Sequence, residues 1–479
     1  MNRIIFSGVP RKALFAFGLL FLLAGCASVD FEQSLSDTNK LAAEFTQGQL
    51  SLAQTTEQRD ALANTAAELL QKPVAQADAV KLALANSPAF QGMLAQNWAS
   101  AANAAQGGRI ANPVLTFERM NMGDEVELSQ ILSFGLLDVL TLPQRYRVAQ
   151  RQIAQAQLQL SNNVIEQVTQ VRQAWVKAVA AQQNLTYARQ VKDAAEASAE
   201  LARRMQAVGN FNKLQRIRQQ AFYADAIMQL ATAQHAVTAT REALVRLLGL
   251  SDAQADMLKL PERLPDLPDQ PRAAEEVSMV AKAGRLDIKL AQSVYEGMLK
   301  AQGISEINSY TDIELGLRRS SKTDEAAGSS TSGSGYEVSV RLPLFDWGGN
   351  RRDALNAQTL AAAYRLEATV RGAGSSLRES YSAYRTAFDI SRHYRDEIVP
   401  LRKLISEENV LLYNGMFIGV FELLADTREQ ISSVMGAIAA SKQFWLADAA
   451  LQASLIGKPT ESGIDSMATT STGSGSGGH

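Results

Sequence analysis

Cys26 is the only cysteine among the 479 residues, and its position suits one reaction, the attachment of lipid to a thiol. It follows Leu23-Ala24-Gly25, at the end of an apolar run from Ala13 to Ala24 that three basic residues precede. This run is too short to span a bilayer and is typical of a signal peptide. Small residues before the cysteine match the bacterial lipobox, which predicts cleavage before Cys26 and lipid on its sulfur and its new amino group. The alternative is an ordinary signal peptide in which a cysteine occurs there by chance.

The residue after Cys26 predicts the destination of the mature chain. Ala27 stands where an aspartate would retain a bacterial lipoprotein in the inner membrane, so the motif implies sorting to the outer membrane of a Gram-negative cell. Each buried CH₂ group of an attached acyl chain contributes about 0.8 kcal/mol to membrane anchoring. Cleavage removes three positive charges and no negative ones, so the formal charge changes from −2 to about −5.

The remaining residues lack the patterns that usually carry catalysis or metal binding. The sequence contains no phosphate-binding loop, no HExxH, no CxxC and no GxSxG pattern. One cysteine and three histidines exclude a zinc-finger type of site and an intrachain disulfide. Lys and Arg together number 47 against 49 for Asp and Glu, so no basic surplus indicates nucleic acid. We therefore expect no enzyme, no cofactor, no metal site and no nucleic-acid partner.

The sequence indicates an internal duplication, because its landmarks recur 206 residues later. The shift aligns Gly209 with Gly415 and Phe211 with Phe417. Alanine-rich helices can align by chance, but chance would not keep glycines and aromatic residues in register. The boundary is the link 261–271, where four prolines cannot continue a helix. Other aligned pairs are Arg145 with Arg351, Ala156 with Ala362, Leu160 with Leu366, Arg172 with Arg378, and Trp175 with Tyr381.

Each half is predicted to contain a long helical hairpin. Apolar residues from Ile153 to Leu185 recur about every 3.56 residues, between the coiled-coil and straight-helix periods. A helix from 144 to 208 would be about 100 Å long at 1.5 Å per residue, so it must pack along similar rods. We expect Pro400 to kink the second rod. The predicted helices are Gln144–Val208 and Asn212–Leu248 in the first half, and Arg351–Asn414 and Val420–Ile456 in the second.

Four segments have the alternating pattern of strands. Apolar residues alternate with polar ones from Tyr336 to Leu344 and from Ile313 to Leu317, and a loop of Ser, Gly and Thr is predicted over Gly328–Gly335. Such segments fit a membrane β-hairpin, and the alternative is a soluble hairpin packed on a core. The first half carries a weaker copy, with strands over Val114–Met120 and Glu125–Leu132 and a turn over Asn121–Asp124.

Hydrogen bonding then requires more than one copy of the chain. Four strands cannot span a bilayer alone, because unpaired backbone groups at the sheet edges would lie in hydrocarbon. Two copies would give eight strands, which side chains fill, and more strands are needed for a water-filled channel. The count of strands allows two, three or four copies and does not choose among them.

Taken together, these features resemble the TolC family of outer-membrane efflux channels over roughly Pro73 to Gly457. The resemblance implies a mainly α fold, internally duplicated, with long coiled helical hairpins that form a periplasmic tube. Four strands per chain would contribute to a trimeric, 12-stranded outer-membrane β-barrel. The resemblance also implies a passive conduit whose partners are a periplasmic adaptor protein, an inner-membrane transporter such as an RND pump, and outer-membrane lipid. The local sequences that carry the resemblance are Ala79–Pro88, Leu342–Gly349, Tyr413–Gly415 and Glu422–Leu424.

The family resemblance also suggests site residues. In the family the hairpin tips meet the adaptor and an acidic ring narrows the periplasmic entrance. Glu422 and Asp426 lie near the acidic positions, about one turn apart on one helix face, and are gate candidates, with two solvated surface acids as the alternative. Arg216 and Arg218, near the first tip, could pair with these acids or be exposed. The tip residues expected to contact the adaptor are Gly209, Phe211, Gly415 and Phe417.

These predictions divide the chain and leave its cargo open. Two rivals to the efflux conduit are a channel for type I protein secretion and a structural coiled-coil lipoprotein that forms no pore. Drugs, toxic small molecules and metal ions are possible cargoes of the conduit. The predicted divisions are a signal peptide (1–25), a lipidated tether and helix (26–72), a first repeat (73–260), the link (261–271), a second repeat (272–457) and a disordered tail (458–479).

Overall fold

The computed structural model describes residues 31–46, 48–123, 125–275, 277, 279, 284–310, 313–324, 328–342, 344–345 and 347–457. The chain divides into two compact units, and each unit draws on both halves of the sequence. The first unit includes Ala95–Leu160 and Lys289–Thr369, and the second includes Leu35–Leu94, Ser161–Ile288 and the described chain from Val370. The predicted domain boundaries stay a prediction.

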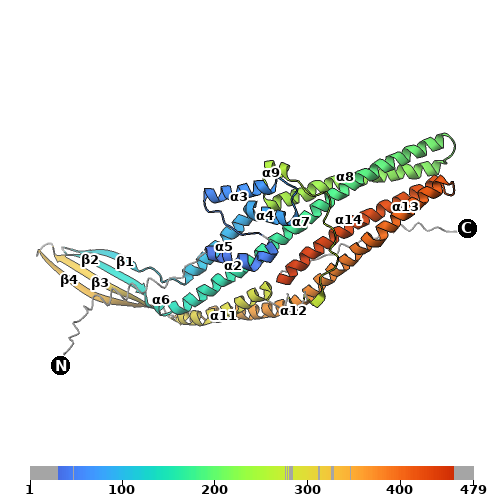
Figure 1. Cartoon of the computed structure of the whole chain (residues 1–479). Helices are drawn as coiled ribbons and strands as arrows, with labels where there is room; N and C mark the ends of the chain where they lie inside the picture. Colours follow the sequence, from blue (N-terminus) through green and yellow to red (C-terminus); the bar gives the residue numbers. More distant parts are fainter. Residues whose placement is uncertain are drawn as a thin grey trace, which may run out of the picture. The chain divides into compact units, whose positions relative to one another are not determined.

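The first unit contains the antiparallel sheet (Figure 1). Its strands are β1 (Val114–Met122), β2 (Glu125–Gly135), β3 (Ile313–Asp324) and β4 (Ser329–Val340), and they pair in chain order. The predicted strands are thus confirmed, but three of them are longer than predicted. β1 runs two residues into the predicted turn over Asn121–Asp124, β2 runs three residues beyond Leu132, and β3 runs seven residues beyond Leu317.

The predicted loop over Gly328–Gly335 is wrong for all but its first residue. Gly328 is in the turn with φ +60°, but Ser329 to Gly335 pair with β3 from Asp324 to Arg318. A ladder is made of backbone hydrogen bonds, which serine, threonine and glycine form as apolar residues do. The strand also ends at Val340, before the predicted Leu344. Proline follows at 343 in the sequence and has no N–H to donate to a ladder.

A short helix and one arginine connect the sheet to the first long helix. The helix α6 (Leu136–Leu140) follows β2, and α7 (Leu142–Ala207) begins directly after it. Arg145 Nη1 lies 2.6 Å from Asp138 Oδ1, while its other nitrogens donate to the backbone oxygens of Gly107 and Arg109. Arg145 therefore fixes the start of α7 against the segment that leads into β1.

The long helices have almost the predicted bounds. α7 has 66 residues, and α8 (Lys213–Leu248) returns from it. In the second half, α12 (Gly349–His393), η1 (Tyr394–Ile398) and α13 (Val399–Asn414) form one continuous rod, and α14 (Val420–Ile456) returns. The π-helical turn η1 comes just before Pro400. A π turn changes the spacing of the backbone hydrogen bonds, so the helix can continue although Pro400 has no N–H to donate.

The predicted apolar stripe of α7 is buried, and its part from Val164 onward belongs to the second unit. Leu160 and Val164 are fully buried, and Trp175 is 2% exposed with its Nε1 donating to Val74 O at 2.8 Å. The second half has an aromatic core in the corresponding place, where the Tyr384 ring lies 5.5 Å from that of Phe444. The first hairpin is joined by a smaller cluster, in which Val191 and Ala195 of α7 pack with Ala226 of α8, so apolar burial holds both hairpins together.

The described part of the segment 26–72, predicted as a lipidated tether and helix, contains two helices. They are α2 (Phe31–Thr46) and α3 (Thr56–Leu69), and α4 (Gln76–Asn86) and α5 (Pro88–Gly107) follow. Arg172 of α7 donates to the backbone oxygen of Phe45 and stacks on its ring at 4.4 Å. This contact attaches the end of α2 to the long helix.

The duplicated glycines Gly249 and Gly457 end α8 and α14 in the same way. Both have left-handed φ values, +66° and +110°. A Cβ on Gly249 would lie 2.6 Å from Ser87 Cα, and one on Gly457 would lie 2.6 Å from Asp287 Oδ1. The helix ends thus approach the chain too closely for any side chain, so both positions require glycine.

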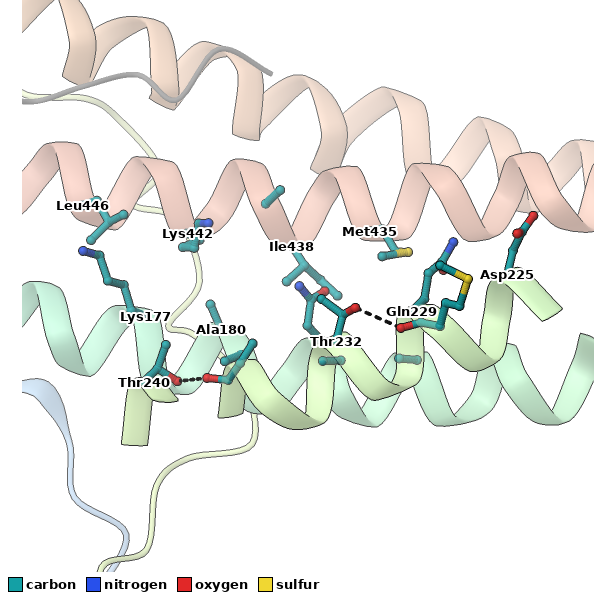
Figure 2. A pocket seen from close by; sticks show the side chains of 17 residues that line it. Lys177, Ala180, Asp225, Gln229, Thr232, Thr240, Met435, Ile438, Lys442 and Leu446 are labelled. Carbon is teal, nitrogen blue, oxygen red and sulfur yellow. Dashed lines mark hydrogen bonds between the residues drawn. The ribbon is translucent and has the colours of Figure 1, made fainter. Parts of the chain in front are cut away.

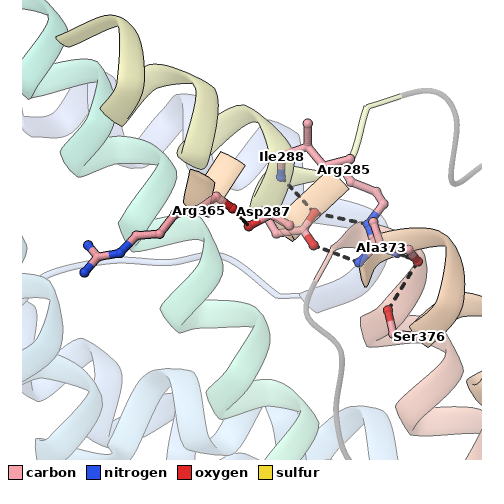
Figure 3. A network of polar contacts seen from close by, with 7 residues as sticks. Arg285, Asp287, Ile288, Arg365, Ala373 and Ser376 are labelled. Atoms are coloured by element: carbon pink, nitrogen blue, oxygen red, sulfur yellow. Dashed lines mark hydrogen bonds and ion pairs between the residues drawn. The ribbon is translucent and has the colours of Figure 1, made fainter. Parts of the chain in front are cut away.

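A buried arginine supports the second of these sites. Arg285 is 5% exposed, forms a two-point pair with Asp287 at 2.8 and 3.1 Å, and donates to Ala373 O (Figure 3). Asp287 also accepts from the N–H of Ile288, at the start of α11 (Leu286–Tyr310). Arg285 therefore joins the start of α11 to the middle of α12.

Candidate functional site

The loop between α7 and α8 is the first predicted tip. Gly209 has φ +81°, and the N–H groups of Asn210 and Phe211 both donate to Met205 O. Asn212 then caps α8 through reciprocal hydrogen bonds with Gln215. Phe211 is only 8% exposed, because its ring packs on Phe421. The tip is therefore closed by an internal aromatic contact.

The second tip, residues 415–419, presents its apolar side chains to solvent. Met416 has φ +61°, a left-handed value that methionine rarely adopts, and it is 92% exposed. Phe417 is 82% exposed, although the repeat aligns it with the buried Phe211. A Cβ on Gly415 would lie 2.8 Å from the exposed Phe417 ring, so a side chain there would displace that ring. The two tips are thus aligned by the sequence repeat, but the first buries its phenylalanine and the second exposes it.

The two predicted gate acids have different surroundings. Glu422 is exposed in the first turn of α14, where the helix dipole favours a negative charge. Asp426 is 9% exposed, and its Oδ2 is buried without a hydrogen-bond partner. No ion pair joins either acid to Arg216 or Arg218 within the part of the chain that the structure describes. Their role as a gate stays a prediction.

The sequence reasoning missed Arg428, which joins the two hairpins beside this gate region. From α14 its Nη2 donates to Gln219 Oε1 at 2.9 Å and to Arg218 O at 3.3 Å, both on α8. Its guanidinium also lies 4.3 Å from the centre of the Phe222 ring. Burial lowers the pKa of Arg428. The sequence pattern could not reveal this contact, because it depends on which face of α14 meets α8.

The sheet has two faces of different chemistry. Opposite residues of antiparallel strands share a face, so the register assigns every side chain. One face, which we name the apolar face, carries exposed Leu115, Phe117, Leu132, Leu317, Tyr336 and Val338. The other, the acidic face, carries all the acids of the described strands, which are Glu118, Glu125, Glu127, Glu314, Asp324 and Glu337.

The bases on the acidic face have partners on the neighbouring strand. Arg318 Nη2 lies 3.5 Å from Glu127 Oε1 and 2.9 Å from Ser129 Oγ. Lys322 Nζ lies 2.5 Å from Glu125 Oε2. The acidic face therefore combines ion pairs and a surplus of carboxylates with exposed Val114, Met120 and Met122 on β1. The apolar face exposes large side chains on all four strands, which water would not favour.

A groove of about 690 Å³ lies between α7, α8 and α14 within the second unit (Figure 2). Alanines, including Ala180, Ala233 and Ala236, line it together with larger apolar and polar side chains. Lys177 and Lys442 lie at one end and Asp225 at the other. The volume is that of a site for a drug-sized molecule.

Other predictions concern features that the described residues do not contain. Cys26, the predicted lipid site, lies outside them. Within the described ranges, no group of three or more His, Cys, Asp or Glu side chains could hold a metal ion. No described helix has both the length and the apolar character to cross a membrane.

Comparison with known proteins identifies the fold. No family model and no curated protein matches the sequence. Among solved structures, the outer membrane protein VceC of Vibrio cholerae is 15% identical with a TM-score of 0.64, over 83% of this chain and 97% of VceC. The CmeC outer membrane channel of Campylobacter jejuni is 13% identical with a TM-score of 0.64, over 88% of this chain and 91% of CmeC.

The open state of the MtrE outer membrane channel of Neisseria gonorrhoeae is 17% identical with a TM-score of 0.62, over 78% of this chain and 87% of MtrE. These structures have the mainly α arrangement predicted here, with long helical hairpins and a small antiparallel sheet. The fold expected from the resemblance to the TolC family is confirmed, and the chain has the fold of the outer-membrane channels.

Proposed function

We propose that this chain, lipidated at Cys26, forms a trimeric outer-membrane channel. It serves as the passive conduit of a tripartite efflux system, from a periplasmic adaptor and an inner-membrane transporter such as an RND pump to the exterior. The two helical tips meet the adaptor, and Glu422 and Asp426 line the entrance. The energy for transport comes from the partner, and this chain is not an enzyme.

The observation that carries this proposal is the open sheet with one apolar face. Among the described strands, β1 pairs only with β2 and β4 only with β3, so both outer edges keep unpaired backbone groups. Such groups cost several kcal/mol each in hydrocarbon, and they are satisfied when edges of neighbouring copies pair. The apolar face then meets lipid, and the acidic face lines the channel.

The family resemblance selects three copies, and the fold is consistent with it. Three sheets supply twelve strands, which leave room for water, whereas eight would be filled by side chains. A lumen lined by the acidic face has a surplus of carboxylates, so it favours cations over anions.

The decisive experiment measures mass and conductance together. The detergent-extracted, lipidated protein should scatter light as a particle of about 150 kDa, three chains of 51.8 kDa less their signal peptides. The same preparation should give stable single-channel currents in a planar bilayer. A lipidated monomer that opens no pores would reject the channel and favour the structural lipoprotein. A pore that carries protein only, with no effect of its deletion on drug or metal sensitivity, would favour type I secretion.

A further inference from the structure

The two faces of the sheet also differ in whether their basic side chains have acidic partners. The apolar face carries two arginines, Arg119 on β1 and Arg319 on β3, and none of the acids of the described strands. Arg318 and Lys322, on the acidic face, each have a glutamate on β2 as partner. Both Arg119 and Arg319 are exposed. Their guanidinium groups are therefore available to an anion that comes from outside the sheet.

The register places both arginines near the turns, where β3 and β4 become polar while β1 and β2 keep exposed Phe117 and Leu128. On β3 and β4, the opposed pair Leu317 and Tyr336 is the last apolar row before the turn. Arg319 stands in the next row, opposite Gln130 and Ser334. Exposed Tyr336 directly below this row is typical of the interface between hydrocarbon and headgroups.

Arg119 stands in the following row, on β1. The strand β2, which carries Gln130, lies between Arg119 and Arg319 on β3. Arg119 lies opposite Leu128, which pairs with Ser321 on β3. Two strand spacings and one two-residue step separate the Cα atoms of the arginines by about 12 Å. Two extended arginine side chains can span that distance, so both guanidinium groups can contact one headgroup. Gln130, which is also exposed, lies on the strand between them.

We propose that Arg119 and Arg319 bind the phosphate of an anionic membrane lipid at the rim of the sheet nearest the turns. The inference rests on the proposed function, which puts the apolar face against lipid. Guanidinium groups bind phosphate oxygens through two parallel hydrogen bonds, which lysine cannot do. The lipid's acyl chains then pack on the apolar rows below, from Tyr336 and Leu317 toward Val340 and Ile313.

The test compares two variants that lose the same charge from opposite faces. R119Q/R319Q removes the lipid-facing pair, and R318Q/K322Q removes two bases from the acidic face. The full-length lipidated protein, purified in phosphate-free detergent, is titrated with phosphatidylglycerol or phosphatidylcholine, and bound lipid is counted by native mass spectrometry. Inorganic phosphate is titrated separately. Single-channel conductance is recorded for all three proteins.

We expect the wild type to prefer phosphatidylglycerol by roughly 25-fold, about fivefold for each arginine near the surface. R119Q/R319Q should lose this preference, and R318Q/K322Q should keep it. Equal loss in both variants, no preference in the wild type, or inorganic phosphate that binds as tightly as the lipid would overturn the inference. If the wild type forms pores without lipid preference, the channel proposal survives this result. If it forms no pores, the channel proposal fails and the inference fails with it.

Discussion

The ring centroids of Phe211 and Phe421 lie 4.5 Å apart, so the tip between α7 and α8 packs on the first turn of α14. The contact joins two hairpins that are far apart in the sequence. It lies beside the Arg428 bridge from α14 to α8, so both contacts hold the same end of the helices together. A tip that must open for transport would have to break this pair.

Replacing Phe211 with alanine should loosen the tip. An aromatic pair contributes about 0.5–1.5 kcal/mol beyond its buried area, so F211A should accelerate hydrogen exchange around residues 205–215 and increase the open fraction of single channels. The matched control is F417A, because Phe417 is 82% exposed in the other tip and has little packing to lose. Equal effects of the two substitutions would show that the Phe211–Phe421 contact does not hold the tip.

Gly249 should be far less tolerant of alanine than a helical glycine is. Alanine there adopts a left-handed φ and its Cβ meets Ser87 Cα at 2.6 Å, so G249A should destabilise the fold by about 2 kcal/mol or more. Gly372 is the control, because it lies inside α12 and a methyl group added there would have open space within 4 Å. G372A should stabilise by roughly 0.5–1 kcal/mol. Melting temperatures in detergent measure both, and a G249A protein as stable as wild type would contradict the close-approach argument.

The long helices could be predicted from the sequence because local signals agree with packing. The stripe through Leu160 and Trp175 has helical spacing, and Gly209 and Asn212 mark the break and the new cap. The bounds of α14 were predicted to the residue. The same helical spacing predicts the fold class, because the apolar stripe of a long helix can be buried only against another long helix.

The missed features depend on contacts between segments. Ser329 to Gly335 has the composition of a loop, and only its ladder with β3 makes it a strand. The charge difference between the two sheet faces depends on register across three strand pairs, which the alternation within one strand cannot give. Arg428 is one arginine among many on the helices, and its bridge to Gln219 follows from the facing of α14 and α8.

Asp448 should make the stability of the fold decrease as pH rises above the ordinary carboxyl pKa of 3.8. Burial raises the pKa of its carboxyl above the ordinary 3.8, although Arg272, a hydrogen bond from Gln452 and Arg172 all favour the charged form. The folded chain therefore holds this proton more tightly than the unfolded chain does. Between the unfolded and the folded pKa, the free energy of unfolding decreases with pH, and the loss is complete above the folded pKa.

D448N removes this titration while keeping the size and the hydrogen-bonding shape of the side chain. The difference in melting temperature between D448N and wild type should grow in favour of the variant as pH rises from 4 toward neutrality. D396N is the control, because the Asp396 pKa is lowered by hydrogen bonds from Arg395 and Arg392. Its contribution is present above the ordinary pKa and is lost as pH falls. A wild type that gains stability over D448N with rising pH would reverse the sign and reject the argument.

Glu422 should control which ions enter the proposed channel. It is exposed in the first turn of α14, and three copies around a trimer axis would attract cations and repel anions. E422Q should therefore shift the reversal potential in a potassium chloride gradient toward zero, with the larger effect at low salt, where screening is weakest. The charge-matched control is E408Q on α13, ahead of the turn at Gly415, which should leave the reversal potential near its wild-type value. If E408Q changes selectivity as much as E422Q, the charge acts through the general field of the tips and Glu422 is not at the gate.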